Sequence, residues 1–421
     1  MKMMKISVMA MLAGGVAAYT ASAAGFGIYQ ASARGIAVGD TLVGSTGDAS
    51  ANYYNPANLT EVEGTATKFG VTVIAPRAKV DYGRTGDKVA AKNQYFYVPH
   101  LFASHQLSEQ FWMGLGLYSE FGLGTAYPKD WVGQEDSLKT DLTTVTFNPN
   151  VAWKICDKVS VAAGLRVMYL DILIRKTPTS ALPPVPGFPP ALSIPTEMRA
   201  DSIGYGYVLG VTVKPIEDLS IGLVYRSSVR QNAEGDVEYS VNPQNVASML
   251  GMTRTSGTVK GSLTFPESVI LGANYKATED LALGVALTWT RWSRFDALTM
   301  HLRNYPSDGA MTTSSEPKNW SNVMRYSVGL EYSLSDAWTL MAGYIHDRDP
   351  INLNYADAKL PAGNRNLFNL GLGWSQGSLT VNGSVGCIFM KKTSGVNPSG
   401  IPIGFSDGIS PMAALSVGKT F

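Results

Sequence analysis

The chain has little of what several classes of protein need. Only two of its 421 residues are cysteine, which excludes a disulfide-built scaffold and a cysteine-rich metal site. Charged residues make up 16%, below the roughly 25% of an ordinary soluble domain. Because 34 Lys plus Arg stand against 33 Asp plus Glu, the chain lacks the basic footprint of a nucleic-acid-binding protein. After residue 24 no apolar run reaches the length of about 18 residues that a membrane-spanning helix requires.

Catalytic and cofactor motifs are also missing. The four histidines show no metal-ligand pairing, and there is no G-x-S-x-G, Walker A or dinucleotide-binding motif. We therefore expect no catalytic residue, no metal and no cofactor. One enzyme alternative stays open, a lipid hydrolase that uses His105 beside Ser104 and Ser108. The position of His105 at a predicted turn favours an interfacial histidine instead.

Residues 1–23 have the form of an export signal. A positively charged start precedes an apolar stretch over residues 6–18 that is too short to span a bilayer, and Ala21-Ser22-Ala23 has the small-x-small form of a cleavage site. We expect cleavage after Ala23 rather than a retained amphipathic anchor. Export would permit a disulfide between Cys156 and Cys387, although their predicted positions do not favour one.

The rest of the chain, from residue 65, alternates with a period of two. One example is the apolar series Leu281, Leu283, Val285, Leu287 and Trp289. Because side chains alternate between the two faces of a strand, each such stretch has one apolar face. The other face carries mostly Gly, Ala, Ser, Thr and Asn, whereas a soluble sandwich would turn Lys, Glu and Asp to water. Apolar residues toward lipid and small or polar ones toward a lumen are typical of a transmembrane β-barrel.

The connections between strands can be counted. Short polar turns are predicted at 108–109, 157–158, 217–218, 279–280, 335–336 and 376–377, and longer Gly-, Pro- or Asn-rich segments at 83–94, 125–140, 176–201, 232–262, 303–321, 350–365 and 391–410. Six short turns and seven long segments predict an all-β fold, a 14-stranded antiparallel transmembrane β-barrel over residues 65–421. Short turns toward the periplasm and long loops outside are expected of the outer membrane of a Gram-negative bacterium.

Residues 24–64 do not alternate. They are rich in Gly, Ala, Ser and Asn, and they could form a periplasmic tail or a plug. A barrel of 14 strands is wide enough to leave a water-filled hole unless something fills it. Because the segment lacks the charged, low-complexity character of a disordered tail, we expect an N-terminal plug, or hatch, inside the lumen.

Several motifs resemble one family of outer-membrane proteins. They are Ala24-Gly25-Phe26, Ser32-Ala33-Arg34-Gly35, Asn55-Pro56-Ala57, Ser119-Glu120-Phe121-Gly122-Leu123, Asn148-Pro149-Asn150, Phe265-Pro266-Glu267 and Thr290-Arg291-Trp292-Ser293-Arg294-Phe295. In this order along the chain they resemble the FadL/TodX family of channels for long-chain fatty acids and other hydrophobic compounds. The resemblance implies a 14-stranded barrel with an N-terminal hatch, which agrees with the strand count.

The resemblance also implies site residues. Ligand capture among the outer loops would use the apolar residues Val185, Phe188, Leu192, Met249, Leu250 and Met252. An inner pocket would meet a carboxylate with basic residues, for which this sequence offers Arg175, Lys176 and Lys318. Asn55, Pro56 and Ala57 would set the gate in the hatch, and Gly122 would mark the strand kink that opens a lateral exit through the wall.

The expected function is passive transport of hydrophobic compounds, with long-chain fatty acids as the first substrate class. A channel for neutral aromatic hydrocarbons is the main alternative, and an aqueous porin for small polar solutes is a weaker one. The expected partners are the hydrophobic ligand, outer-membrane lipid and lipopolysaccharide, with no nucleic acid, and the chain is expected to be a monomer.

Overall fold

The strands of the chain close into a ring. The computed structural model describes residues 25–83, 88–181, 191–240, 255–304, 307–397 and 399–421. Within them, consecutive strands pair in antiparallel fashion, and β1 (Thr65–Ile74) pairs with β24 (Pro402–Thr420), the last strand. Joining collinear pieces gives the predicted 14 crossing strands. The predicted fold, an all-β barrel, is confirmed.

Several crossing strands consist of two pieces separated by a short irregularity. The two-piece strands are β1 with β2 (Arg77–Tyr82), β3 (Lys88–Ala90) with β4 (Phe96–Gln106), β5 (Phe111–Tyr118) with β6 (Gly122–Ala126), β12 (Leu219–Arg226) with β13 (Val229–Tyr239), β14 (Ser256–Phe265) with β15 (Ser268–Lys276), β16 (Leu281–Thr290) with β17 (Ala297–Arg303), β18 (Met311–Pro317) with β19 (Val323–Ser333), and β22 (Leu379–Met390) with β23 (Thr393–Val396). The others are β7 (Lys139–Cys156), β8 (Val159–Lys176), β11 (Thr196–Ile216), β20 (Trp338–Asp347), β21 (Arg365–Gln376) and β24.

The remaining elements are short. β9 (Thr179–Ala181) and β10 (Ala191–Ser193) form a separate hairpin. The helices are α2 (Ala33–Ala37), α3 (Ala51–Tyr54), η1 (Pro56–Glu61), η2 (Trp292–Arg294) and η3 (Leu353–Tyr355). None of the helices among the described residues is long and apolar enough to cross a membrane.

The alternating pattern decides which side of the wall each residue faces. On β16, Leu283, Val285 and Leu287 are exposed on the outer surface, whereas Ala286 and Thr288 are buried toward the lumen. The same arrangement recurs on the other strands, so the outer surface carries a continuous apolar belt. Both cysteines are free, and Cys156 is exposed.

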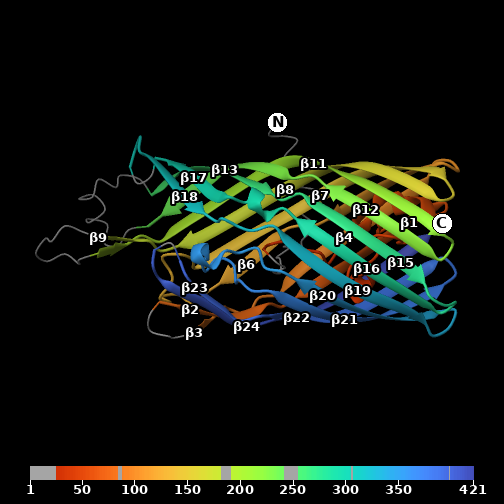
Figure 1. Ribbon diagram of the computed structural model, residues 1–421. Helices are drawn as coiled ribbons and strands as arrows, with labels where there is room; N and C mark the ends of the chain where they lie inside the picture. Colours follow the sequence, from red (N-terminus) through yellow and green to blue (C-terminus); the bar gives the residue numbers. More distant parts are fainter. Residues whose placement is uncertain (1–24, 84–87, 182–190, 241–254, 305–306, 398) are drawn as a thin grey trace, which may run out of the picture.

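The turns and loops differ in how well the sequence predicts them. Each of the six predicted short turns lies at a boundary between consecutive strands, all at the end that carries the C-terminus (Figure 1). The long segments were predicted too wide, because β13, β14, β18, β23 and β24 all run into ranges expected to be loops. The strands continue beyond the apolar belt as polar extensions, where the sequence loses the lipid-facing pattern. β9, β17 and β18 reach the opposite end from the C-terminus (Figure 1).

The segment before β1 contacts the inner face of strands all round the ring. Ala33 donates its backbone N–H to Ser416 Oγ on β24 (2.9 Å), Gly44 donates to Asn274 Oδ1 on β15 (3.0 Å), and the Asn52 side chain donates to the backbone of β4. Strands so far apart can touch one segment only if that segment lies inside the barrel. Small residues on the wall make room for it, and Gly343 on β20 is one of them.

Gly343 yields a test of this arrangement. A Cβ atom there would lie 2.2 Å from the backbone N of Gly39 and 2.5 Å from the carbonyl carbon of Val38, so Gly343→Leu cannot coexist with the segment in place. We expect the barrel to fold and the segment to be displaced, giving large conductance steps in planar bilayers.

Gly383 provides the matched control on β22. No atom lies within 4 Å of a Cβ built there, and its cross-strand partners Leu372 and Leu415 are exposed on the lipid side. Gly383→Leu should stay electrically silent, like the unmodified chain. Equal conductance from both variants would contradict the placement of residues 25–64.

Candidate ligand cavity and gate

The barrel wall has a window between β4 and β6. β4 pairs with β5 as far as Leu101 and Leu117, and it has no register with β6, whereas β7 pairs with both pieces. The wall closes again further out, where the Lys92 N–H donates to Ala126 O (2.7 Å). Gly122, predicted as a kink residue, is the first residue of β6, immediately after this break.

The N-terminal segment fills the window like a short strand. Gly27 forms an isolated antiparallel bridge with Phe121. Ile28 donates its N–H to Glu120 O (2.7 Å), and Gly122 donates its N–H to Phe26 O (2.7 Å). In a lipid environment these groups would otherwise lack partners, and an unsatisfied backbone group there costs several kcal/mol. The backbone that interrupts the wall is therefore satisfied by the hatch segment.

Phe26 places its ring among aromatic side chains on the inner side of this window. Its centroid lies 4.8–6.1 Å from the ring centroids of Trp292, Phe295, Trp320, Phe265 and Phe121. Four of these five pairs are edge-to-face and the fifth is tilted, and edge-to-face pairs are favoured by the ring quadrupole. One residue thus connects the window to the interior.

An apolar cavity begins at this aromatic cluster. Its walls come from the inner faces of β7, β8, β14 and β17 together with the loop between β20 and β21, and the lining side chains include Phe26, Leu142, Ile172, Ile174, Leu263, Phe295, Leu298, Trp320 and Leu360. A second cavity shares Ile172, Ile174, Leu263 and Leu298 with the first. The two are therefore adjoining chambers of one apolar space.

One side of the larger cavity is charged. Lys318 Nζ lies 2.5 Å from Asp357 Oδ2 and 3.1 Å from Glu316 Oε2. Lys359 Nζ lies 2.8 Å from Asp136 Oδ1 and 3.2 Å from Glu316 Oε2. Lys318, Asp357 and Lys359 line the cavity directly.

These charges hold one another in the ionised state. Burial alone would lower the pKa of Lys318 and raise that of Asp357, but the neighbouring opposite charges overcome it. Asp357 and Glu316 raise the pKa of Lys318, and Lys318 with Lys359 lowers the pKa of Asp357. Lys318 and Asp357 are therefore both charged at neutral pH.

The three predicted carboxylate-binding residues separate in the structure. Lys318 lines the cavity, and Lys176 Nζ lies 3.7 Å from Glu316 Oε1, at the edge of the same cluster. Arg175 lies on the opposite face of β8, where its exposed side chain pairs with Glu197 (2.7 Å). Side chains of neighbouring residues on a strand point to opposite faces, so residues 175 and 176 cannot both reach one cavity.

The structure describes one of the six predicted capture residues. Val185, Phe188, Met249, Leu250 and Met252 fall outside the described residues. Leu192 is buried on the β9–β10 hairpin.

Asn55, Pro56 and Ala57 anchor the hatch to the wall. The Asn55 side-chain amide donates to Val43 O (2.9 Å), Val211 O (3.1 Å) and Thr212 Oγ1 (2.9 Å), while its oxygen accepts the N–H of Ala57 (3.1 Å). The side chain thus caps η1 and ties it to β11, and Pro56 stands at the first helical position, where its missing N–H costs nothing. None of the three residues lines the cavity.

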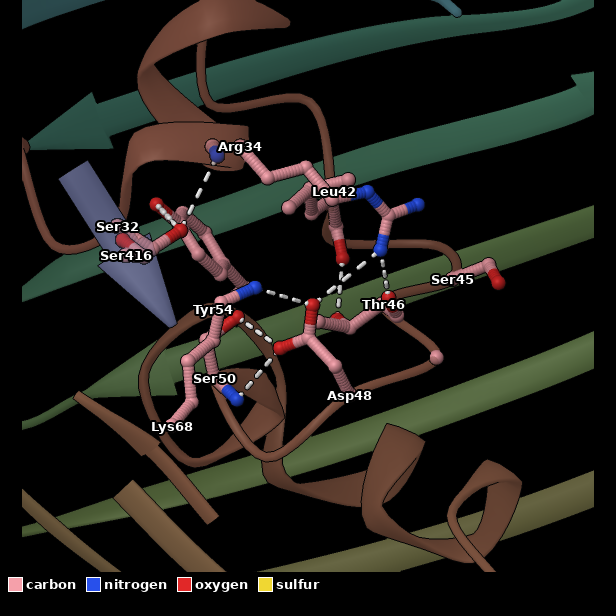
Figure 2. A network of polar contacts seen from close by, with 12 residues as sticks. Ser32, Arg34, Leu42, Ser45, Thr46, Asp48, Ser50, Tyr54, Lys68 and Ser416 are labelled. Carbon is pink, nitrogen blue, oxygen red and sulfur yellow. Dashed lines mark hydrogen bonds and ion pairs between the residues drawn. The ribbon is translucent and has the colours of Figure 1, made fainter. Parts of the chain in front are cut away.

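A polar network holds the other side of the hatch (Figure 2). Arg34 on α2 donates to Thr46 O and to Asp48 (3.4 Å). It also donates to both carboxylate oxygens of Glu331 on β19 (2.7 and 2.8 Å). Lys68 on β1 completes the network at 2.6 Å from Asp48. Charge-assisted hydrogen bonds to two separate strands fix α2 within the ring.

His105, the residue of the hydrolase alternative, is exposed on β4, with Nδ1 2.7 Å from Thr65 Oγ1. Within the part of the chain that the structure describes, no group of three or more His, Cys, Asp or Glu side chains could hold a metal ion.

A closed ring of 14 antiparallel strands with an apolar outer belt is a transmembrane β-barrel of the outer-membrane type. The chain belongs to the outer membrane protein transport protein family (OMPP1/FadL/TodX), whose model matches residues 14–401. Members of this family transport hydrophobic compounds across the outer membrane of Gram-negative bacteria.

Characterised relatives match along most of the chain. It is 25% identical over 374 residues to a long-chain fatty acid transport protein of Escherichia coli O6:H1, covering 83% of each chain. It is 26% identical over 372 residues to a 47 kDa outer membrane protein of Pasteurella multocida, covering 85% of each.

Solved structures share the fold. A FadL homologue of Pseudomonas aeruginosa superposes with a TM-score of 0.83 at 21% identity, covering 94% of this chain and 99% of the other. The toluene transporter TodX of P. putida superposes with a TM-score of 0.74 at 17% identity, covering 93% and 98%.

Several residues of the site were not identified from the sequence. Glu316, Asp357 and Lys359 come from polar segments predicted as ordinary outer loops. Trp320 falls in the same predicted loop as Glu316, over residues 303–321. Phe26 and Phe295 stood within motifs shared with the family, but nothing in the pattern indicated that their rings meet. Segments far apart in the chain make these contacts.

The Arg34 network makes a prediction about hatch stability. Arg34→Met removes charge-assisted hydrogen bonds to Glu331 and Asp48, each of which typically contributes about 2 kcal/mol. We expect faster hydrogen exchange at Ile36 and Val38, whose N–H groups bond within α2. Arg175→Met, which breaks an exposed pair on the outer face, serves as the control and should leave this exchange unchanged. Unaltered protection in Arg34→Met would show that the network does not hold the hatch.

Proposed function

We propose that this chain is a passive channel for long-chain amphipathic compounds, with long-chain fatty acids as the first substrate class. In this proposal the ligand is captured at the outer loops, occupies the apolar cavity, and leaves sideways through the window between β4 and β6. The observation that carries it is the cavity itself, a long apolar space with ammonium groups on one side.

The lining of the cavity supports a chain-like ligand. The two adjoining chambers share Ile172, Ile174, Leu263 and Leu298, and they are lined mostly by apolar side chains with a few polar groups, as is usual for pockets that enclose a small apolar molecule. Each methylene removed from water contributes about 0.8 kcal/mol. An acyl chain therefore gains affinity along the whole length of the space.

Lys318 is the residue proposed to meet the ligand carboxylate. Its side chain is only 7% exposed and lines the cavity, so a carboxylate beside it would form a charge-assisted hydrogen bond in a poorly hydrated place. Lys176 would add positive potential at the edge of the cluster. Arg175 has no part in this proposal, because its side chain lies on the other face of β8.

Phe26–Ile28 is the proposed gate. This segment lines the cavity with Phe26 and satisfies the backbone of the window with Gly27 and Ile28, so its displacement would join the cavity to the lateral exit. Asn55, Pro56 and Ala57 would keep the rest of the hatch on the wall while this end moves. Gly122 would contribute as the first residue beyond the break.

The surroundings follow from the fold. We propose that the apolar belt contacts outer-membrane lipid and lipopolysaccharide and that the chain acts as a monomer, since its first and last strands pair with each other and close the ring within one chain. Transport by this chain would need no catalytic step and no cofactor.

A channel for neutral aromatic hydrocarbons is the second candidate. Lys176, Lys318 and Lys359 already have acidic partners, which lowers the attraction that the cavity offers to a further carboxylate. The apolar lining alone would suit a neutral ligand.

Uptake of labelled oleate by cells that lack their own fatty-acid channel tests the proposal. Cells that make this chain should take up oleate, and Lys318→Met should reduce uptake about tenfold or more, since truncating one partner of a buried charge pair costs 2–5 kcal/mol. Lys318→Arg should keep most of the uptake, and Arg175→Met should match the unmodified chain.

Toluene uptake in the same cells separates the two candidates. Toluene uptake without oleate uptake, with the protein confirmed in the outer membrane, would refute the fatty-acid proposal in favour of the hydrocarbon channel. Oleate uptake that is equal in Lys318→Met and in the unmodified chain would retain the channel but remove Lys318 from its carboxylate site.

A further inference from the structure

The charged cluster in the cavity is balanced. Lys176, Lys318 and Lys359 supply three ammonium groups, and Asp136, Glu316 and Asp357 supply three carboxylates, joined by N–O distances of 2.5 to 3.7 Å. A ligand carboxylate that enters this cluster makes a fourth anion. Because an uncompensated buried charge is strongly unfavourable, binding of the ligand as a carboxylate favours the departure of one of the three resident carboxylates.

Asp357 is the carboxylate best placed to leave. Glu316 belongs to β18 of the barrel, and Asp136 is tied to its surroundings by accepting the Ala358 N–H (2.6 Å) and by pairing with Lys359. Asp357 lies on the loop between β20 and β21 and lines the cavity, where its Oδ2 makes the shortest contact with Lys318 Nζ, at 2.5 Å. It stands where the head group of a ligand would bind.

The loop around Asp357 forms part of the cavity wall and is fixed at two points. On one side, Asp349 accepts the N–H groups of Gly363 (2.6 Å) and Ile351 (3.3 Å). On the other, Tyr127 Oη donates to Ala358 O (2.7 Å) and Thr125 Oγ1 donates to Lys359 O (2.9 Å). Residues 351–357 lie between these anchors, and Ile351, Tyr355, Ala356 and Asp357 line the cavity.

We propose that Asp357 is an internal substitute for the ligand carboxylate, which holds residues 351–357 against Lys318 and is displaced when an acidic ligand binds. The exchange swaps one carboxylate for another at the same ammonium group, so the charge of the buried cluster is conserved once Asp357 has moved out to water. It makes opening of this part of the wall dependent on an anionic head group. The inference rests on the proposed function, since it requires a ligand that carries a carboxylate.

Asp357→Asn is the variant that tests the displacement of Asp357 by a ligand carboxylate. Asp357 Oδ1 accepts the Lys359 N–H (3.0 Å), and an asparagine oxygen can keep this turn while losing the charge. Without the competing carboxylate, the affinity of the purified protein for oleate should rise about tenfold, as expected for loss of one close charge pair. Its affinity for oleyl alcohol, which has the same chain and no charge, should stay unchanged.

Hydrogen exchange of residues 351–357 reports the movement itself. In the unmodified protein, saturating oleate should speed exchange in this segment, and saturating oleyl alcohol should not. In Asp357→Asn, hydrogen exchange of residues 351–357 should already be fast without ligand. Two controls test whether the effect belongs to Asp357. Glu316→Gln removes a charge from the same cluster and should leave residues 351–357 closed without ligand. Asp407→Asn removes an acid that pairs with Lys79 (2.9 Å) and should change neither oleate affinity nor hydrogen exchange.

The possible failures are distinguishable. If the unmodified protein binds oleate while hydrogen exchange of residues 351–357 does not respond, the proposed displacement of Asp357 is refuted and the fatty-acid proposal stands. The same conclusion follows if Glu316→Gln behaves like Asp357→Asn. If oleate does not bind while oleyl alcohol or toluene does, the fatty-acid proposal fails, and the proposed displacement of Asp357 by a ligand carboxylate fails with it.

Discussion

Backbone groups that face lipid need hydrogen-bond partners within the protein, and this requirement shapes the whole chain. It closes the strands into a ring, with β1 paired to β24. Where β4 and β6 separate, the same requirement brings in Phe26–Ile28 to bond with residues 120–122. An opening in the wall and the segment that closes it are thus parts of one structural solution. Phe26 lines the cavity with its ring and bonds to the window with its backbone. A movement of the aromatic cluster would therefore act directly on the window.

The interior divides according to chemistry. The cavity is apolar on most sides, and its charges are gathered on one side, where Lys318 and Asp357 meet. A buried ion pair of this kind contributes little net stability after desolvation. We therefore explain the Lys318–Asp357 pair by ligand binding and not by stability. In our proposals a ligand carboxylate takes the place of Asp357, and the acyl chain takes the apolar space.

The hatch is held far more firmly than its small helices would suggest. α2, α3 and η1 have 5, 4 and 6 residues, too few for stable isolated helices. Side-chain bonds to the wall replace the missing helical stability, from Asn55 on one side and from Arg34, through Glu331, on the other. The first few described residues lack such charged anchors and are held by aromatic packing, two backbone bonds and the Tyr53 hydroxyl, which donates to Ile28 O (3.3 Å). In our proposal this difference makes Phe26–Ile28 the part of the hatch that moves.

The sequence by itself determined the barrel, because a period of two with one apolar face is a local property that the lipid boundary enforces on every strand. It also determined the strand count, through the six polar turns, and it indicated Asn55 and Gly122 through family motifs. It placed the loop boundaries poorly, since the polar extensions of β13 and β18 lack the lipid-facing pattern. Only the tertiary structure decided that Lys318 faces the cavity and Arg175 does not, and that Asp357 and Lys359 join Lys318 there. Those contacts depend on which loop folds over which strand end, and no local pattern in the chain records that choice.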